Sequence, residues 1–545
     1  MKGFWIGWVF FLLTGSLFSQ SLSDAIRIQL ENPSKEKESL TKGSSIVHFE
    51  EVKAYYSGRN FSSIWFQQKK ISPLVRELQA EIKQSKYDGL KPETYHLDFL
   101  DHLLASEEQA ENTQIPLTPE DLSQAEILLT DAFFALCRDL EIGKINSVQL
   151  KATWGIPFKK SKNTHGALLD QAFREGHLFF VLNSLRPPTK MYQAGRQLMM
   201  ELEKKAQLQE DQNWKPIKLD RSIKLGDSHS SVPKIRSRLN FLGFPTSLTE
   251  IDSKNYDSLL FEQVVAYQRK EGLLDDGVIG QRTVASLNET PIQKMDKLSV
   301  NLERMRWIPN EYFLKDAIWV NIPSYRLHYR TDQDTLFSTK VIVGMVKNQT
   351  PVFSAEMSYL IFSPFWNIPS SIARNETIPA IKKNPNYLEH NHMEVINQSG
   401  HPVPNSSINW NAKPFPFLIR QKPGPDNALG QVKFMFPNSH NVYLHDTPAK
   451  SLFDRETRTF SHGCIRMQNP RQFAELILGQ YPNWNSEKIG EAMNQAEEQR
   501  VDLDHRIPVI VVYLTFGLGE KGNPEFYTDV YNRDTEVLLL LKSVW

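Results

Sequence analysis

The stretch VYLHDTPAKSLFDRETRTFSHGCIR, residues 442–466, brings together the side chains of this sequence that are best suited to chemistry. It contains Cys464, one of only 2 cysteines in 545 residues, together with His445 and His462. A thiol is a strong nucleophile only when ionised, and neighbouring histidines or backbone N–H groups favour the thiolate. His445 ends a strand-like segment, and the residues between can loop back toward Cys464. We therefore expect Cys464 to be a nucleophile and His445 its base.

Two neighbours of Cys464 predict further parts of such a site. Gly463 lets the backbone approach closely, so that the N–H groups of Gly463 and Cys464 could form an oxyanion hole. Arg466 carries a planar, permanently charged fork that suits a substrate carboxylate. The types of residue gathered here are not those that apolar packing would select, which favours catalysis over a bystander role.

A metal site is the alternative that these residues leave open. Zinc accepts ligands of the types found at His440, His445, His462 and Cys464, although a His-x-Cys pair fits no common zinc spacing. The HNH segment around His390 is expected to be a solvated loop instead. No metal and no cofactor is expected at the site.

Strand-like segments lie on both sides of the opening stretch. β-Branched and aromatic residues separated by turn residues are typical of strands, and they occur in AIWVNIPSYRLHYR, TKVIVGMV, NVYLHD and IPVIVVYLTF. A Pro- and Asn-rich tract at about 367–430 is long for a connection inside a compact β domain, and such tracts are usually functional. Residues 300–545 are predicted to form a mainly-β domain with an insertion at about 370–430.

The preceding parts of the chain are predicted to be helical. Residues 21–215 carry apolar residues at helical spacing, in segments that end near Gly89 and Gly143. Catalytic residue types do not gather in this part, so a packed scaffold is expected. Residues 216–290 read as a small bundle of short amphipathic helices with a tight turn in DDGVIG. The expected fold class is therefore multidomain α+β.

The net charge and the N-terminal segment limit the classes of function that fit this sequence. Lys+Arg and Asp+Glu both number 63, which argues against a nucleic-acid partner recognised by bulk charge. Residues 1–20 combine Lys2 with an apolar run from Phe4 to about Leu17, shorter than the ~20 residues of a membrane span. This pattern predicts a signal peptide and an exported protein. An uncleaved anchor is the alternative.

The second cysteine, Cys137, lies in the apolar, helix-like run AEILLTDAFFALCRDLEIG. A small buried hydrophobe is the expected identity of such a residue. An exported chain can form disulfides, but we expect no bridge between Cys137 and Cys464, and a free thiol at Cys464.

The motif VYLHDTP followed by SHGCIR resembles that of the L,D-transpeptidases with a YkuD-type catalytic domain, a His, a spacer and then Ser/Thr-His-Gly-Cys. RMRWIP, VIVGMVKNQTPVFS, FSPFWNIPSSIARNE and, in the helical part, YYSGRNFSSIWF resemble the large periplasmic YcbB-like branch. AYQRKEGLLDDGVIGQRTVASLN resembles the three-helix peptidoglycan-binding module. The resemblance covers nearly the whole exported chain.

The resemblance implies roles for individual residues. Cys464 matches the nucleophile and His445 the general base, and Ser461, His462 and Gly463 match the rest of the motif. The insertion at about 370–430 corresponds to a capping subdomain over the active site.

Two positions near the base complete the implied site. Tyr443 matches a residue that lines the same pocket. Asp446 is a departure, since the family often has Gly or Ser there. In related enzymes the backbone carbonyl at this position orients the base, so no role is expected for the Asp446 carboxylate.

The implied reaction forms 3→3 peptidoglycan cross-links. Cys464 attacks the carbonyl after the diamino acid of a tetrapeptide stem, releases the terminal D-alanine, and passes the acyl group to the side-chain amine of another stem. The family's thiol is also acylated by carbapenems. Tetrapeptide stems and other cell-wall synthesis enzymes are the implied partners, with a part in cell-wall biogenesis and cell shape in a Gram-negative periplasm.

Three alternatives stay open beside this reading. A zinc-dependent cell-wall peptidase would act on the same peptides, and a non-catalytic peptidoglycan-binding scaffold would need no thiol. The same thioester could also lead to hydrolysis or to D-amino-acid exchange.

Overall fold

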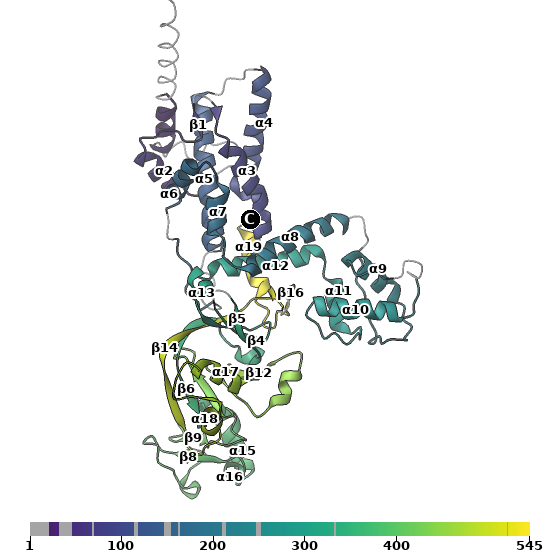
Figure 1. Ribbon diagram of the computed structural model, residues 1–545, viewed down its shortest axis with the longest axis vertical. Helices are drawn as coiled ribbons and strands as arrows, with labels where there is room; N and C mark the ends of the chain where they lie inside the picture. Colours follow the sequence, from purple (N-terminus) through teal and green to yellow (C-terminus); the bar gives the residue numbers. More distant parts are fainter. Residues whose placement is uncertain are drawn as a thin grey trace, which may run out of the picture.

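The computed structural model describes residues 21–31, 46–67, 70–113, 118–145, 154–161, 164–209, 214–246, 252–331, 334–519 and 522–544. Figure 1 shows a helical part at one end, a β-sheet domain at the other, and a small helical unit to one side. The predicted signal peptide, residues 1–20, lies outside these ranges. Within them, no helix combines the length and apolar character that crossing a membrane requires.

The helical part packs around α5, Pro119–Ile142, which is buried on almost all sides. A capping box begins this helix, because Thr118 and Asp121 bond each other's backbone N–H groups. Gly143, at φ +88°, ends it. Around α5 lie α2 (Phe49–Gly58), α3 (Leu74–Gln84), α6 (His165–Glu175) and α7 (Phe179–Leu185), and α4 (Leu97–Thr113) packs on α3. Helix α8 (Lys190–Gln209) follows, and its Tyr192 and Met199 belong to the core of the β domain. The predicted helical region is confirmed.

The small unit consists of three helices around its own apolar core. They are α9 (Val232–Leu242), α10 (Ser258–Lys270) and α11 (Gln281–Asn288). Its core includes Ile235, Leu239 and Val264, which are 0% exposed. The predicted turn is held by Gln268, whose Oε1 accepts from Gly277 N at 2.9 Å.

The β domain is built on one large sheet that closes on itself. Its order is β12-β5-β13-β11-β10-β6-β14-β3-β4, and β4 also pairs with β5, so that the sheet forms a barrel. The strands are β3 (Ala317–Asn321), β4 (Arg326–Arg330), β5 (Thr335–Gly344), β6 (Phe353–Phe362), β10 (Val432–Met435), β11 (Leu444–His445), β12 (Thr459–Ser461), β13 (Ile465–Met467) and β14 (Gln499–Val512). Barrel closure leaves few unpaired strand edges. It also holds β11 and β13 rigidly side by side.

Short helices accompany the barrel strands, one before β3 and two between β13 and β14. These are α13 (Asn310–Leu314), α17 (Pro470–Leu478) and α18 (Ser486–Ala492). The α17 residues Phe473, Ala474 and Ile477 belong to the same buried core as the strands.

The insertion between β6 and β10 folds as a unit rather than as an open loop. Strands β7 (Trp366–Asn367), β9 (Leu418–Gln421) and β8 (Met393–Ile396) form a three-stranded sheet in that order. Short helices α14 (Ser370–Ile372), α15 (Ile378–Lys383) and α16 (Tyr387–His390) accompany it, with one π-helical turn at Ala373–Thr377. Residues such as Ile381, Leu388 and Val395 form a separate core.

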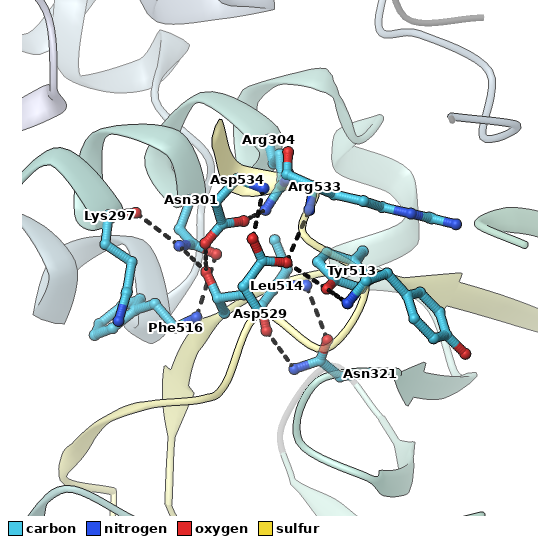
Figure 2. Close-up of polar contacts among 12 residues, drawn as sticks. Lys297, Asn301, Arg304, Asn321, Tyr513, Leu514, Phe516, Asp529, Arg533 and Asp534 are labelled. Carbon is cyan, nitrogen blue, oxygen red and sulfur yellow. Dashed lines mark hydrogen bonds and ion pairs between the residues drawn. The ribbon is translucent and has the colours of Figure 1, made fainter. Parts of the chain in front are cut away.

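Helix α12 (Pro291–Trp307) joins the helical part to the β domain. It packs against α8 and against the C-terminal helix α19 (Asp534–Ser543). Figure 2 shows the polar contacts at this junction, in which Arg304 donates to Asp534 Oδ1 at 2.5 Å. Asp529 accepts from the backbone N–H groups of Arg533 and Asp534, both at 2.9 Å. This junction fixes the C-terminal segment against the barrel.

Candidate active site

The predicted base lies on a barrel strand, β11, and the predicted nucleophile lies in the turn directly before the neighbouring strand, β13. β11 runs parallel to β13, with Leu444 opposite Ile465 and His445 opposite Arg466. Directly opposed residues project to the same face of a sheet, and successive residues alternate. Leu444 and Ile465 are 0% exposed and point into the core, so His445 and Arg466 share the other face.

Tyr443 and Cys464 extend this pairing by one position and fall on the same face as His445. A backbone hydrogen bond supports this extended pairing, because Ile465 N donates to Tyr443 O at 3.1 Å. The Tyr443 and His445 rings lie 5.6 Å apart between centroids. Tyr443 also lies near enough to Cys464 to lower the pKa of its thiol. The structure thus gathers four of the sequence-predicted residues on one face.

His445 is held in one tautomer by the following residue. Its Nδ1 lies 2.5 Å from Asp446 O, and since a carbonyl oxygen only accepts, we assign the proton to Nδ1. Nε2 is then the basic nitrogen, and it makes no hydrogen bond to any described residue. Burial and the positive charge of Arg466 lower the pKa of His445 to about 3, although the Asp446 bond raises it. The imidazole is therefore neutral at neutral pH and ready to accept a proton.

The Asp446 carboxylate accepts hydrogen bonds from other neighbours and makes none to the base. Its Oδ1 accepts from Lys450 Nζ at 2.6 Å, and its Oδ2 accepts from Gln431 N at 2.9 Å. The contact of the base with the Asp446 backbone carbonyl is the one that the resemblance implied.

Cys464 is a half-buried thiol in its resting state. Its Sγ lies 3.8 Å from Asn441 O. Burial raises the pKa of Cys464, while the hydrogen bonds of Tyr443 and the charge of Arg466 act in the opposite direction. Tyr443 and Arg466 favour the thiolate as predicted, but desolvation outweighs them, so Cys464 rests as a neutral thiol on the face that carries the neutral His445 imidazole.

The turn before Cys464 is arranged differently from the expected pair of oxyanion donors. Gly463 N donates to Ser461 Oγ at 3.1 Å, and Ser461 Oγ donates to Cys464 O at 2.5 Å. The Gly463 N–H group is therefore already engaged. Gly463 has φ +119°, a conformation that favours glycine at this position.

His462 points toward the insertion. Its Nε2 lies 3.0 Å from Glu376 Oε1, and both side chains are partly exposed. Glu376 belongs to the π-helical turn, so the insertion reaches the Ser461–Cys464 turn.

Arg466 keeps part of its hydrogen-bonding capacity free. Its Nε is buried and makes no hydrogen bond to any described residue. Burial lowers the pKa of Arg466, and the nearby Cys464 raises it. A positively charged guanidinium near the thiol suits a carboxylate or carbonyl oxygen of a ligand.

The histidines of the metal alternative do not gather into a metal site. Among the described residues, no group of three or more His, Cys, Asp and Glu side chains is placed to hold a metal ion. The His440 ring instead packs on Phe353, with centroids 5.1 Å apart. His390 and His392 are exposed, as expected for a solvated segment.

Sequence reasoning missed two residues that contact the motif. Thr350 Oγ1 donates to Gly463 O at 2.8 Å, and Glu376 meets His462. Both lie in segments quoted for the family resemblance. No spacing rule connects either residue to the motif.

Three parts of the chain match models of known domains. Residues 50–199 match a scaffold domain, residues 228–287 a peptidoglycan binding domain, and residues 315–509 the L,D-transpeptidase catalytic domain, YkuD. The last match contains His445, Cys464 and the insertion.

A curated relative and two solved structures are similar to parts of this chain. A curated Haemophilus influenzae protein, "Putative L,D-transpeptidase", is 34% identical over 245 residues, which are 45% of this chain and 49% of that protein. The chain thus spans about half the length of this relative. An L,D-transpeptidase structure from Stackebrandtia nassauensis is 14% identical, with 53% and 94% of the chains covered and a TM-score of 0.19. One from Xylanimonas cellulosilytica is 13% identical, with 54% and 99% covered and a TM-score of 0.18.

The fold, the site and the domain matches together define the class. This chain carries a YkuD-type L,D-transpeptidase catalytic domain together with a peptidoglycan-binding domain. The narrower likeness to the YcbB-like branch stays a prediction, as do the domain boundaries drawn from the sequence.

Proposed function

We propose that this protein is a cysteine-dependent L,D-transpeptidase that forms 3→3 cross-links between peptidoglycan stems, with Cys464 as nucleophile and His445 as general base. One observation carries the proposal. His445 shares a face of the barrel with Cys464, and its Nδ1 is tied to Asp446 O, so that the lone pair of Nε2 is the free base. A buried neutral imidazole beside a thiol is the arrangement that proton transfer during attack requires.

The first step is acylation of the thiol. Cys464 Sγ attacks the carbonyl carbon after the diamino acid of a tetrapeptide stem, and the thiol proton moves to His445 Nε2. The tetrahedral intermediate collapses with cleavage of the C–N bond. The imidazolium returns the proton to the departing amine of D-alanine, which leaves a thioester on Cys464.

The second step transfers the acyl group to another stem. The side-chain amine of the acceptor attacks the thioester carbon, the C–S bond breaks, and a 3→3 amide bond forms. His445 takes the proton from the attacking nitrogen and returns it to the Cys464 sulfur, so the enzyme ends as it began.

The insertion supports transfer over hydrolysis. The contact between His462 and Glu376 brings the insertion to the catalytic turn, where it can keep water from the thioester while the acceptor binds. Arg466 is proposed to bind an oxygen of the stem through its charged guanidinium, and Tyr443 to line the same pocket.

Intact-mass spectrometry of the purified protein with a carbapenem tests the thioester. We expect a single adduct that survives chelator treatment and is absent from Cys464→Ala. No adduct on a folded wild-type protein would reject the reactive thiol. Loss of the adduct with chelator would favour the zinc peptidase.

Product analysis separates the fates of the thioester. With tetrapeptide donors and an acceptor stem, we expect a cross-linked product and free D-alanine. Tripeptide alone would indicate hydrolysis, and incorporation of an added D-amino acid would indicate exchange.

The place of action proposed for this protein is a Gram-negative periplasm, where peptidoglycan stems are exposed. The N-terminal pattern of residues 1–20 and the peptidoglycan-binding domain support it. Cell fractionation of the tagged full chain tests it, and recovery in the cytoplasm would reject it.

A further inference from the structure

The Gly463–Cys464 peptide group is held from its carbonyl side by a residue outside the motif. Thr350 Oγ1 donates to Gly463 O at 2.8 Å, and Thr350 is 0% exposed. A peptide group is planar and trans, so its C=O and N–H point in opposite directions. The Thr350 hydroxyl thereby sets the direction in which Cys464 N–H points.

The direction of this hydroxyl is itself determined. Gly344 N donates to Thr350 Oγ1 at 2.9 Å. A threonine hydroxyl has one proton to give, and with an N–H group directed at its lone pair, that proton goes to Gly463 O. A side chain on Gly344 would collide with Asn348 O and Thr350 N, so the loop packs directly on this glycine.

Tyr531, from the C-terminal segment, braces the same contact. Its hydroxyl donates to Gly344 O at 2.6 Å and accepts from Thr350 N at 3.2 Å. Tyr531 N in turn donates to the Tyr513 hydroxyl at 2.8 Å, and the two rings stack 5.7 Å apart. Tyr513 is anchored to Asp529 in the junction of Figure 2.

The peptide group held in this way bears the donor that acyl transfer needs. The attacked carbonyl oxygen gains negative charge, which a preorganised N–H group can stabilise. Gly463 N–H is occupied by Ser461 Oγ. Cys464 N–H, in contrast, has no acceptor among the described residues.

We propose that Thr350 is a positioning residue that aims Cys464 N–H at the developing oxyanion, with Tyr531 as its brace. This inference rests on the proposed acyl transfer at Cys464. The hydroxyl acts through the peptide group and does not touch the substrate.

Two reactions of the same thiol test the inference. Acylation by a carbapenem develops an oxyanion, whereas alkylation by iodoacetamide is a displacement at carbon that develops none. In Thr350→Val, which keeps the branched shape and loses the hydroxyl, we expect acylation to slow by about 10- to 100-fold. Alkylation should stay within about twofold of wild type, because the thiol and its base are untouched.

Two further variants complete the design. Thr350→Ser keeps the hydroxyl, and its acylation rate should return to within about threefold of wild type. Tyr531→Phe removes the brace and should slow acylation by about 3- to 10-fold. Thermal melting identifies the folded variants, and Tyr531→Phe decides the question if Thr350→Val does not fold.

The outcomes separate this inference from the proposed function. The positioning role would be overturned if Thr350→Val, or Tyr531→Phe where Thr350→Val does not fold, were acylated at the wild-type rate. An equal loss of alkylation and acylation would also overturn it, because it would indicate a general structural effect. A wild-type protein that is alkylated but never acylated would overturn the proposed function instead.

Discussion

The two cysteines of this chain occupy opposite kinds of environment. Cys137 lies in α5, the central helix of the helical part, and is 0% exposed. Cys464 lies half-buried in the turn before β13, on the face that carries His445. Both thiols are free.

Burial raises the pKa of both thiols, so burial alone does not separate them. Around Cys137 the negative charges of Glu141 and Glu51 raise the pKa further. Around Cys464 the charge of Arg466 and the hydrogen bonds of Tyr443 lower it. The two thiols therefore differ in the charges and hydrogen bonds around them, and these neighbours determine how readily a thiolate forms.

The largest expected difference between the cysteines concerns acylation. Cys464→Ala should abolish the carbapenem adduct in intact-mass spectra, and Cys137→Ala should leave one adduct per chain. The physical reason is that the Cys137 thiol is fully buried in an apolar core, and that burial and the nearby negative charges raise its pKa. An adduct that persists in Cys464→Ala and disappears in Cys137→Ala would reverse the comparison.

The second-largest effect on acylation is expected from removing the proposed base, His445. In His445→Gln, acylation should fall by about 10²- to 10⁴-fold, because general base catalysis contributes about this much. Stopped-flow or quenched mass measurements give the rate. Alkylation of Cys464 at alkaline pH, where the thiolate forms without help, is the matched control and should stay within about twofold. Equal acylation in wild type and variant would show that another group takes the proton.

The pH dependence of alkylation sharpens the comparison further. Because burial raises the pKa of Cys464, the reactive thiolate is the minor form at neutral pH and increases as pH rises. The iodoacetamide rate should therefore climb by about tenfold per pH unit from neutrality to about pH 9. His445 has a pKa lowered to about 3, so the imidazole is neutral over this range and His445→Gln should keep the slope. A plateau already at neutral pH would indicate a preformed thiolate–imidazolium pair.

The smallest expected effect concerns stability. Here substitution of Cys137 should have the larger effect and substitution of Cys464 the smaller one, the reverse of their order in acylation. Cys137→Ser places a hydroxyl in a fully buried apolar site, and should lower the free energy of unfolding by about 1–3 kcal/mol. Cys464→Ser, at a half-buried turn, should change it by less than about 0.5 kcal/mol. Denaturant unfolding of both variants measures the difference. A larger loss in Cys464→Ser would mean that the catalytic turn contributes to stability.

The sequence alone was sufficient for the elements whose signals are local. The apolar spacing around Cys137 predicted a buried helix, and the region is helical with Cys137 in its core. The β-branched segments predicted strands that became β3, β5, β11 and β14. The motif around Cys464 predicted which residues would meet, and the parallel pairing of β11 and β13 brings His445 to the face of Cys464.

Other features of the site depended on the tertiary structure. The sequence indicated a thiolate favoured by its neighbours, whereas desolvation leaves a resting thiol. It indicated two oxyanion donors, whereas Ser461 occupies Gly463 N–H. The Pro- and Asn-rich composition at about 367–430 indicated a functional connection, and only the tertiary structure shows that this segment folds as a unit with its own core.

What the sequence by itself determined, then, was the identity of the reactive residues and the helices and strands that carry them. Only the tertiary structure decided the protonation of the pair, the free donor at Cys464 N–H and the contacts of Thr350 and Glu376 with the catalytic turn. Those contacts join residues 113 and 86 positions apart. Periodicity and motif spacing report interactions within one element, whereas desolvation and long-range hydrogen bonds exist only after the barrel and its insertion have closed around the thiol.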